Sequence, residues 1–182
     1  MKNLFKISAV LLLAVLFTVS SCKKDEQIIE GCTDSSAMNY QSLATSNNGS
    51  CEFAYEIAQG DWGINSQCDS VSISIPLLGD FEIPMADMFP DSVVIGGEGN
   101  QKVSIDINGS KIFADIDYNG IITVEKQTIS MELEELGGTQ LDVEVSGNGI
   151  IESATKGNLD LHLSFSVLSI PADSNCEIVF SR

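Results

Sequence analysis

The chain has 182 residues, in which 26 acidic side chains face only 9 basic ones, for a net charge of −17. A surface this acidic repels phosphate backbones, so we expect no nucleic-acid partner. The sequence holds a single histidine and no Cys-x-x-Cys pair, which disfavours most zinc sites and thiol redox sites.

The N-terminal segment has the parts of a secretory signal peptide. Lys2 and Lys6 precede an apolar run over residues 7–19, and small residues then lead to Cys22. The run is too short for a transmembrane helix, which takes roughly 20 apolar residues. A cysteine directly after small residues is typical of a bacterial lipoprotein, in which the sulfur receives lipid. We expect residues 1–21 to be a lipoprotein signal peptide and Cys22 to hold the lipid; an ordinary cleaved signal with a free thiol is the alternative.

The residues after Cys22 form a charged tether over 22–30. Its Lys-Lys-Asp-Glu sequence at 23–26 resembles the export signal of Bacteroidota-type surface lipoproteins. The resemblance implies display on the outer face of the outer membrane, with palmitate or a similar acyl chain as the anchor. Without residues 1–21 the chain keeps 7 basic and 26 acidic residues, a net charge of −19.

The cysteine count suggests two disulfides. Once Cys22 is assigned to lipid, an even number of cysteines remains for an oxidising compartment. Four cysteines permit three pairings. We favour one bond that closes a short polar loop and a second that ties both ends of the strand-rich region, namely Cys32–Cys51 and Cys68–Cys176.

Residues 31–53 are polar and have neither a helical nor a strand period. They are similar to a short module of secreted proteins of the same bacteria, with the pattern G-C-T-D-x-x-A-x-N-Y and, further on, D-D-G-S-C. If the resemblance extends to calcium, the implied ligands are Asp34, Asn39, Asn47 and Asn48. The last two replace the usual acidic pair, and calcium affinity follows carboxylate count, so we expect weak binding. The alternative is a disulfide-closed spacer without metal.

From Gly60 onward apolar and polar residues alternate. A period of two with one apolar face is typical of antiparallel strands with one wet side. The pairs Asn108-Gly109 and Asn119-Gly120 predict tight hairpin turns. We predict an all-β domain over residues 60–182, an antiparallel meander of seven or eight strands that closes as a barrel or a sandwich.

The start and end of this domain resemble the lipocalin-like domains of surface lipoproteins. Gly60-Asp61-Trp62 opens the first strand, and in such domains a cysteine soon after the aromatic residue pairs with one in the last strand, here Cys176. No arginine lies within the body of the last strand, and Arg182 is the final residue. We therefore expect Trp62 to be a core aromatic at one end of the barrel, with no arginine packed on it.

The sequence offers little catalytic chemistry. His162 shares the polar face of one predicted strand with Asp160 and Ser164. Residues i and i+2 on a strand are about 6.6 Å apart, whereas a nucleophile and its base need roughly 2.6–3.2 Å. No G-x-S-x-G, HExxH or phosphate-binding glycine loop is present. We expect no enzyme and no cofactor apart from calcium.

Residues 76–90 combine several large apolar side chains with prolines and aspartates, and they break the alternation. They could form a lid over a barrel mouth, a partner-binding loop or a flap that completes the core. Together with the apolar inner face of the barrel around Trp62, Phe113 and Phe165, this segment suggests a binding surface for an apolar small ligand or a surface protein. The residues that the segment contributes are Phe81, Met85, Met88 and Phe89. The competing hypothesis is a structural or adhesive surface protein whose β domain is filled.

Overall fold

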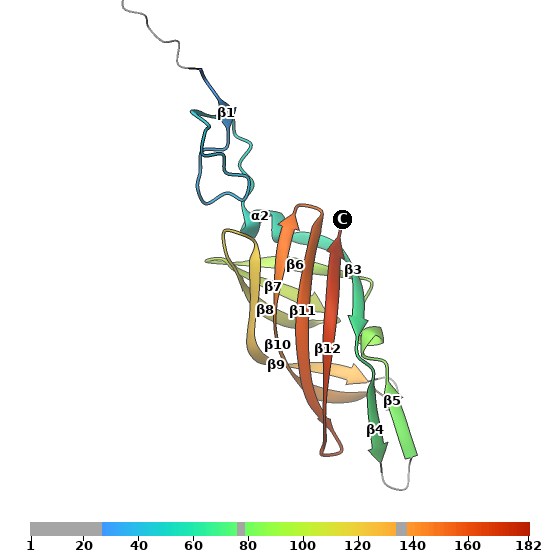
Figure 1. Cartoon of the computed structure of the whole chain (residues 1–182). Coiled ribbons are helices and arrows are strands. Elements are labelled where there is room, and N and C mark those ends of the chain that lie inside the picture. Colours follow the sequence, from blue (N-terminus) through green and yellow to red (C-terminus); the bar gives the residue numbers. More distant parts are fainter. Residues whose placement is uncertain (1–26, 76–78, 134–137) are drawn as a thin grey trace, which may run out of the picture.

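A computed structural model describes residues 27–75, 79–133 and 138–182 (Figure 1). The signal peptide predicted at 1–21, the lipid site predicted at Cys22 and the tether as far as residue 26 lie outside the described residues. Within the described residues, no helix is both long and apolar enough to cross a membrane.

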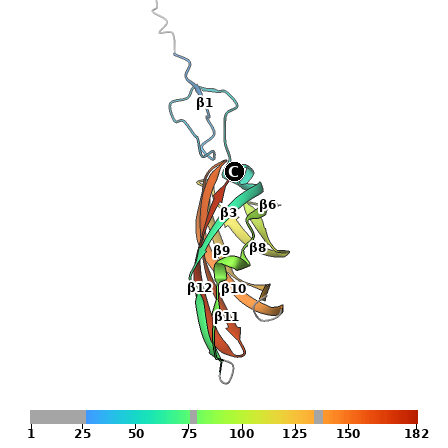
Figure 2. The same cartoon turned by 90° about the vertical axis from the view of Figure 1, so that its right-hand side faces the viewer.

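The predicted all-β fold is confirmed: β10, β11, β12, β3, β6, β7, β8 and β9 form, in that order, a closed eight-stranded barrel of lipocalin-like build. Every neighbouring pair in the barrel is antiparallel. The long strands β10, β11 and β12 lie opposite the shorter β6 and β8 (Figure 2). The barrel strands are β3 (Gly60–Cys68), β6 (Ser92–Gly99), β7 (Lys102–Ile107), β8 (Ser110–Ile116), β9 (Ile121–Leu133), β10 (Thr139–Ser153), β11 (Lys156–Val167) and β12 (Ile170–Ser181).

Alternation along each strand decides which side chains enter the barrel. In β11, Leu159, Leu161 and Leu163 are buried, while Asp160 and His162 between them face solvent. The predicted turn at Asn108-Gly109 joins β7 to β8, and both residues have positive φ, 51° and 86°. Asparagine and glycine tolerate this conformation, which a tight hairpin turn requires.

The barrel interior is filled by side chains. The inward-facing apolar residues of the described strands belong to one hydrophobic cluster, in which Ile122, Val145 and Ile151 have no exposed surface. Trp62, Met85 and Phe180 are among the largest of them. A cavity that could hold a ligand would leave accessible area on the residues around it. The interior is therefore a packed core, as the hypothesis of a filled β domain expected.

One end of the barrel is closed by the short helix α2 (Ala54–Ala58) and by the chain terminus. The indole Nε1 of Trp62 donates to the carbonyl of Ala58 at 2.7 Å, and the ring of Phe180 meets the indole edge-on at 5.9 Å between centroids. The guanidinium of Arg182 lies 3.8 Å from the centre of the Trp62 ring. The expectation that no arginine packs on Trp62 was wrong, because β12 runs far enough to bring Arg182 over the indole.

The opposite end is closed by the segment between β3 and β6. It forms the hairpin β4 (Val71–Ile75) and β5 (Gly79–Ile83), followed by the 3-10 turn η1 (Met85–Met88). Ile83, Met85 and Phe89 belong to the core cluster. Of the roles considered for residues 76–90, the described part fits a flap that completes the core.

A small loop module precedes the barrel and contains only β1 (Glu30–Gly31) and β2 (Ser46–Asn47), which pair in parallel. The disulfide Cys32–Cys51 closes the module, and Cys68–Cys176 joins directly paired residues of β3 and β12. Both predicted disulfides are confirmed. Met38 of the module packs against the barrel core, so module and barrel touch at the α2 end (Figure 1).

Candidate functional site

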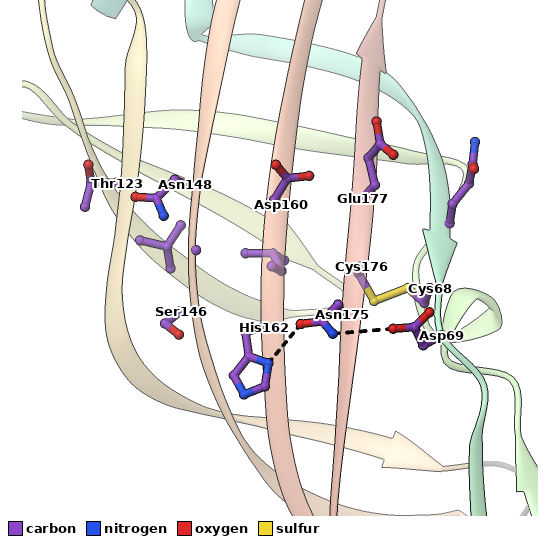
Figure 3. Close-up of a pocket in the computed structure, with 14 residues that line it drawn as sticks. Cys68, Asp69, Thr123, Ser146, Asn148, Asp160, His162, Asn175, Cys176 and Glu177 are labelled. Atoms are coloured by element: carbon purple, nitrogen blue, oxygen red, sulfur yellow. Dashed lines mark hydrogen bonds between the residues drawn. A yellow bond between two sulfur atoms is a disulfide. The ribbon is translucent and has the colours of Figure 1, made fainter.

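A groove of about 740 Å³ opens on the outer wall of the barrel (Figure 3). It is larger than three other surface cavities of about 500, 360 and 200 Å³. Residues of β9, β10, β11, β12 and β3, together with Asp69 just after β3, line it; the polar ones face outward, and Val124, Leu161 and Cys176 form its buried floor. The lining residues are Gln67, Cys68, Asp69, Thr123, Val124, Ser146, Gly147, Asn148, Asp160, Leu161, His162, Asn175, Cys176 and Glu177.

The groove forms where β10 bends. Val145 pairs with Gln127 of β9 and Gly147 with Val124, so that Ser146 faces two residues of β9 in a β-bulge. A Cβ added to Gly147 would lie 2.1 Å from the carbonyl oxygen of Asp160 on β11. Glycine at this position therefore lets the two backbones approach, and the bulge and close approach together bend the wall.

Strand register arranges the lining in two rows. In one row, Asn148 pairs with Asp160, which pairs with Glu177, which pairs with Gln67. In the next row, Ser146 pairs with His162 and His162 with Asn175. Directly paired side chains on one face of a sheet are about 4.5–5.5 Å apart at Cβ. Residues up to 110 positions apart in sequence, Gln67 and Glu177, thus face one shared surface.

A chain of hydrogen bonds runs along the second row, which contains Ser146, His162 and Asn175. His162 Nδ1 lies 3.1 Å from Asn175 Oδ1, and Asn175 Nδ2 donates to Asp69 Oδ2 at 3.4 Å (Figure 3). Because an amide oxygen only accepts, His162 Nδ1 carries the proton of this bond. The other ring nitrogen, Nε2, is left to meet solvent or a partner.

The groove is acidic. Asp69, Asp160 and Glu177 line it, and no lysine or arginine is among its residues. Asp160 and Glu177 are direct cross-strand partners, an arrangement that is destabilising for like charges. A cationic group, or a dense set of hydrogen-bond donors, would relieve this repulsion.

The structure places one further candidate nucleophile, Ser146, beside His162. Ser146 is its direct cross-strand partner, a neighbour that inspection of a single strand does not find. Among the described residues, however, no hydrogen bond joins the Ser146 hydroxyl to the imidazole, whose contact is with Asn175. The groove lacks the bonded pair of nucleophile and base that covalent catalysis uses. The absence of enzymatic activity stays a prediction.

The residues predicted to bind an apolar ligand do not form one surface. Trp62, Met85, Phe89 and Phe165 are buried in the core, and Phe81 and Met88 pack partly buried against it. Phe113 is 50% exposed on the outer wall, so its assignment to the inner face was wrong. In β8 the inward positions belong to Ile112, Ala114 and Ile116, which leaves Phe113 on the opposite face.

The side-chain oxygens of the four residues proposed as calcium ligands accept hydrogen bonds from backbone amides. Asp34 Oδ1 accepts from the Ser36 amide at 2.9 Å, and Asn39 Oδ1 accepts from the Glu52 amide at 2.9 Å. Asn47 and Asn48 accept in the same way from the amides of the second residue after each, at 2.9 and 3.0 Å. In the ranges that the structure describes, no group of three or more His, Cys, Asp or Glu side chains is placed to hold a metal. Weak calcium binding and a metal-free spacer both remain open as alternatives for the loop module.

Of the groove residues, sequence reasoning singled out Asp160, His162 and the disulfide partners Cys68 and Cys176, and it missed the others. Those with exposed polar side chains in the strands, such as Thr123, Asn148 and Glu177, stand at outward positions of alternating strands, and that signal is present in the sequence. What the sequence does not give is the register that aligns Thr123, Asn148, Asp160 and Glu177 across the wall.

Comparison with protein-family models, with curated proteins and with solved structures found no match to this chain. The proposals below therefore rest on its own sequence and geometry.

Proposed function

We propose that this chain is a lipid-anchored protein of the outer-membrane surface that binds a polar, cationic partner through the groove on the outer wall of its barrel, without catalysis. The lipid on Cys22 would hold it at the membrane, residues 23–30 would space it from the lipid, and the barrel would present the groove.

One observation supports the groove as the binding surface: the interior is packed, while the outer wall is hollowed and lined by polar side chains. Of the two ligand types expected from the sequence, this favours a surface partner over an apolar small molecule. Acid groups without a basic neighbour favour a partner that brings positive charge.

A structural or adhesive role is the second candidate, and the filled interior favours it equally. The two candidates differ in what touches the groove. A recognition protein has a defined molecule in contact with Asn148 and His162, whereas a spacer does not.

Photo-crosslinking on living cells separates them. A photoreactive amino acid replaces Asn148 in the groove or, as the matched control, Glu82 on the exposed face of β5. We expect a discrete crosslinked product from position 148 alone, which disappears in the triple variant Asp69→Asn, Asp160→Asn, Glu177→Gln. Equal or no product from both positions supports the structural role.

The anchor is tested separately. Cells fed a clickable palmitate analogue should label the wild-type chain and leave Cys22→Ala unlabelled. A wild-type chain that remains unlabelled contradicts the lipoprotein assignment and leaves the groove proposal to the crosslinking result.

A further inference from the structure

The wall of the barrel has a seam between β8 and β9. Their backbones pair only at Asp115–Thr123 and Ile116–Ile122. The register of β9 against β10 shifts at residues 125–126, and beyond this bulge no backbone pairing of β9 with β8 occurs in the described ranges. Among the described residues, Ser110–Ala114 of β8 have no backbone pairing with β9, and we call the space along this stretch the β8–β9 seam.

Side chains bridge the seam in place of a backbone ladder. The amide of Phe113 donates to Gln127 Oε1 at 2.9 Å, and Gln127 Nε2 donates to the carbonyl of Phe113 at 2.7 Å. This is the pair of bonds that a peptide group of a neighbouring strand would make with Phe113. The carboxamide of Gln127 thus occupies the position of a missing strand. At the other end, the Ser110 hydroxyl donates to the carbonyl of Ser130.

Further backbone groups on this edge are unpaired. Amides and carbonyls alternate between the two sides of a strand, so those of Lys111 point the same way as those of Phe113. No backbone pairing of Lys111 toward β9 occurs in the part of the chain that is described. A row of such groups is a template for an added strand.

The seam also offers sites for side chains. Phe113, half exposed, borders a cavity of about 200 Å³ at the Gln127 end. A cavity of about 500 Å³ at the Ser110 end is lined in part by Asp87, Met88 and Glu132.

The charges around the seam favour a basic occupant. The nearby lysines are already paired: Lys102 with Asp115, Lys111 with Glu98, and Lys126 with Glu144, at 2.7, 3.3 and 2.7 Å. Neither Asp87 nor Glu132 has an ion pair within the described ranges. A second copy of this acidic chain would add like charge here, so we exclude it as the occupant.

We propose that the β8–β9 seam binds an extended peptide segment of a partner protein by strand addition to β8. The peptide backbone replaces the carboxamide of Gln127 on Phe113 and pairs with Lys111. An apolar side chain of the peptide packs on Phe113, and a lysine or arginine enters the cavity beside Asp87 and Glu132. This is a second interaction surface, independent of the outer-wall groove.

The test uses the whole mature chain and a pool of synthetic octapeptides with Val or Ile at alternate positions and Lys, Thr or Ser between them. Because Gln127 competes for Phe113, Gln127→Ala should bind these peptides about tenfold more tightly than wild type, the ratio that loss of one competing pair of neutral hydrogen bonds gives. Gln127→Glu, which cannot donate to the Phe113 carbonyl, should change affinity in the same direction. Gln67→Ala, in the outer-wall groove, is the matched control and should bind as wild type does.

Three results support strand addition together. The same peptides N-methylated at alternate residues do not bind, the amide signals of Lys111 and Phe113 shift on binding, and Asp87→Asn with Glu132→Gln weakens only the lysine-containing peptides. Failure of every peptide to bind Gln127→Ala overturns the proposal, as does equal binding of the N-methylated forms or a shift confined to the groove. None of these results depends on the crosslinking at position 148, so the two proposals fail separately.

Discussion

The guanidinium of Arg182 stacks 3.8 Å above the centre of the Trp62 indole and joins the last residue of the chain to the first strand of the barrel. Its Nη2 also donates to the carbonyls of Ala58 and Gln59, at 3.3 and 2.6 Å. Trp62 itself donates to Ala58. Helix α2, β3 and the end of β12 are thus held at one point, which closes this end of the barrel.

Replacement of Arg182 should therefore destabilise the barrel. A cation over a desolvated indole, together with hydrogen bonds to two carbonyls, predicts that Arg182→Ala lowers the free energy of unfolding by about 2 kcal/mol. Urea denaturation followed by the fluorescence of the single tryptophan measures this. Arg182→Lys keeps the charge but loses the planar fork, so it should recover only part of the loss. Unchanged stability of Arg182→Ala would show that the stacking is incidental.

The two disulfides should differ in what they stabilise. Cys68–Cys176 spans 108 residues and links barrel strands, whereas Cys32–Cys51 spans 19 residues within the loop module. In the loop-entropy model, a closed loop of about 100 residues contributes roughly 4.7 kcal/mol. We expect the double variant Cys68→Ala, Cys176→Ala to lower barrel stability by about 4–5 kcal/mol. The matched variant Cys32→Ala, Cys51→Ala should leave the barrel transition in place, and an equal loss from both pairs would contradict this division.

The strands of this fold were predictable because apolar and polar residues alternate along each of them. The alternation in β8 also predicts the correct face for Phe113. Phe113 lies between the inward-facing Ile112 and Ala114, so it shares the outward face with charged Lys111. Its assignment to the inner face followed aromatic character rather than phase, and phase was the better guide. A side chain between two charged neighbours on one face points to solvent.

The register between strands that are distant in the sequence could not be predicted, because the local pattern of residues does not contain it. Pairing of Phe180 with Ile64 and of Ser181 with Gly63 is what carries Arg182 to Trp62. The same kind of pairing assembles the groove from five strands. Closure of the barrel fixes these pairs jointly, so no segment read alone reveals them.

Acid should weaken one contact on the outer wall. The pKa of Glu98 lies below its ordinary value of 4.5, first because the Ser104 hydroxyl donates to its carboxylate at 2.7 Å and second because Lys111 pairs with it. Because the pKa of Glu98 is lower in the folded than in the unfolded chain, its ionised carboxylate stabilises the fold at pH values above the unfolded-state pKa. This stabilisation is lost as the pH falls through the folded-state pKa. Ser104→Ala should therefore raise the pKa of Glu98, as an NMR titration of its carboxyl carbon will measure. Lys111→Met should raise it as well, because it removes both a hydrogen bond and a positive charge, and no change in either variant would show that the carboxylate is free in solution.

Chelation tests the role of the loop module. Asp34, Asn39, Asn47 and Asn48 already direct their side-chain oxygens at backbone amides, so the hydrogen bonds and the disulfide can hold this loop without an ion. We expect EGTA to leave the melting temperature of the whole chain unchanged. Asn39→Ala should destabilise the module, because Asn39 bridges the Glu52 amide and the Ser50 carbonyl. A fall in melting temperature on chelation that added calcium reverses would instead establish a calcium site.

Gly147 links the packing of the barrel to the shape of the groove. A Cβ there would lie 2.1 Å from the Asp160 carbonyl oxygen, an approach that backbone atoms relieve only by moving apart. Gly147→Ala should thus lower stability by about 2–3 kcal/mol and, by moving β11, disturb the His162–Asn175 contact between β11 and β12. The matched control is Gly63→Ala in β3, whose Cβ would lie 3.4 Å from the nearest atom and should change stability by no more than about 0.5 kcal/mol. Urea denaturation gives both values, and the histidine ring signals report the groove. If the two alanine variants are equally stable, β10 and β11 are not held as closely as the groove requires, and its floor must be formed in another way.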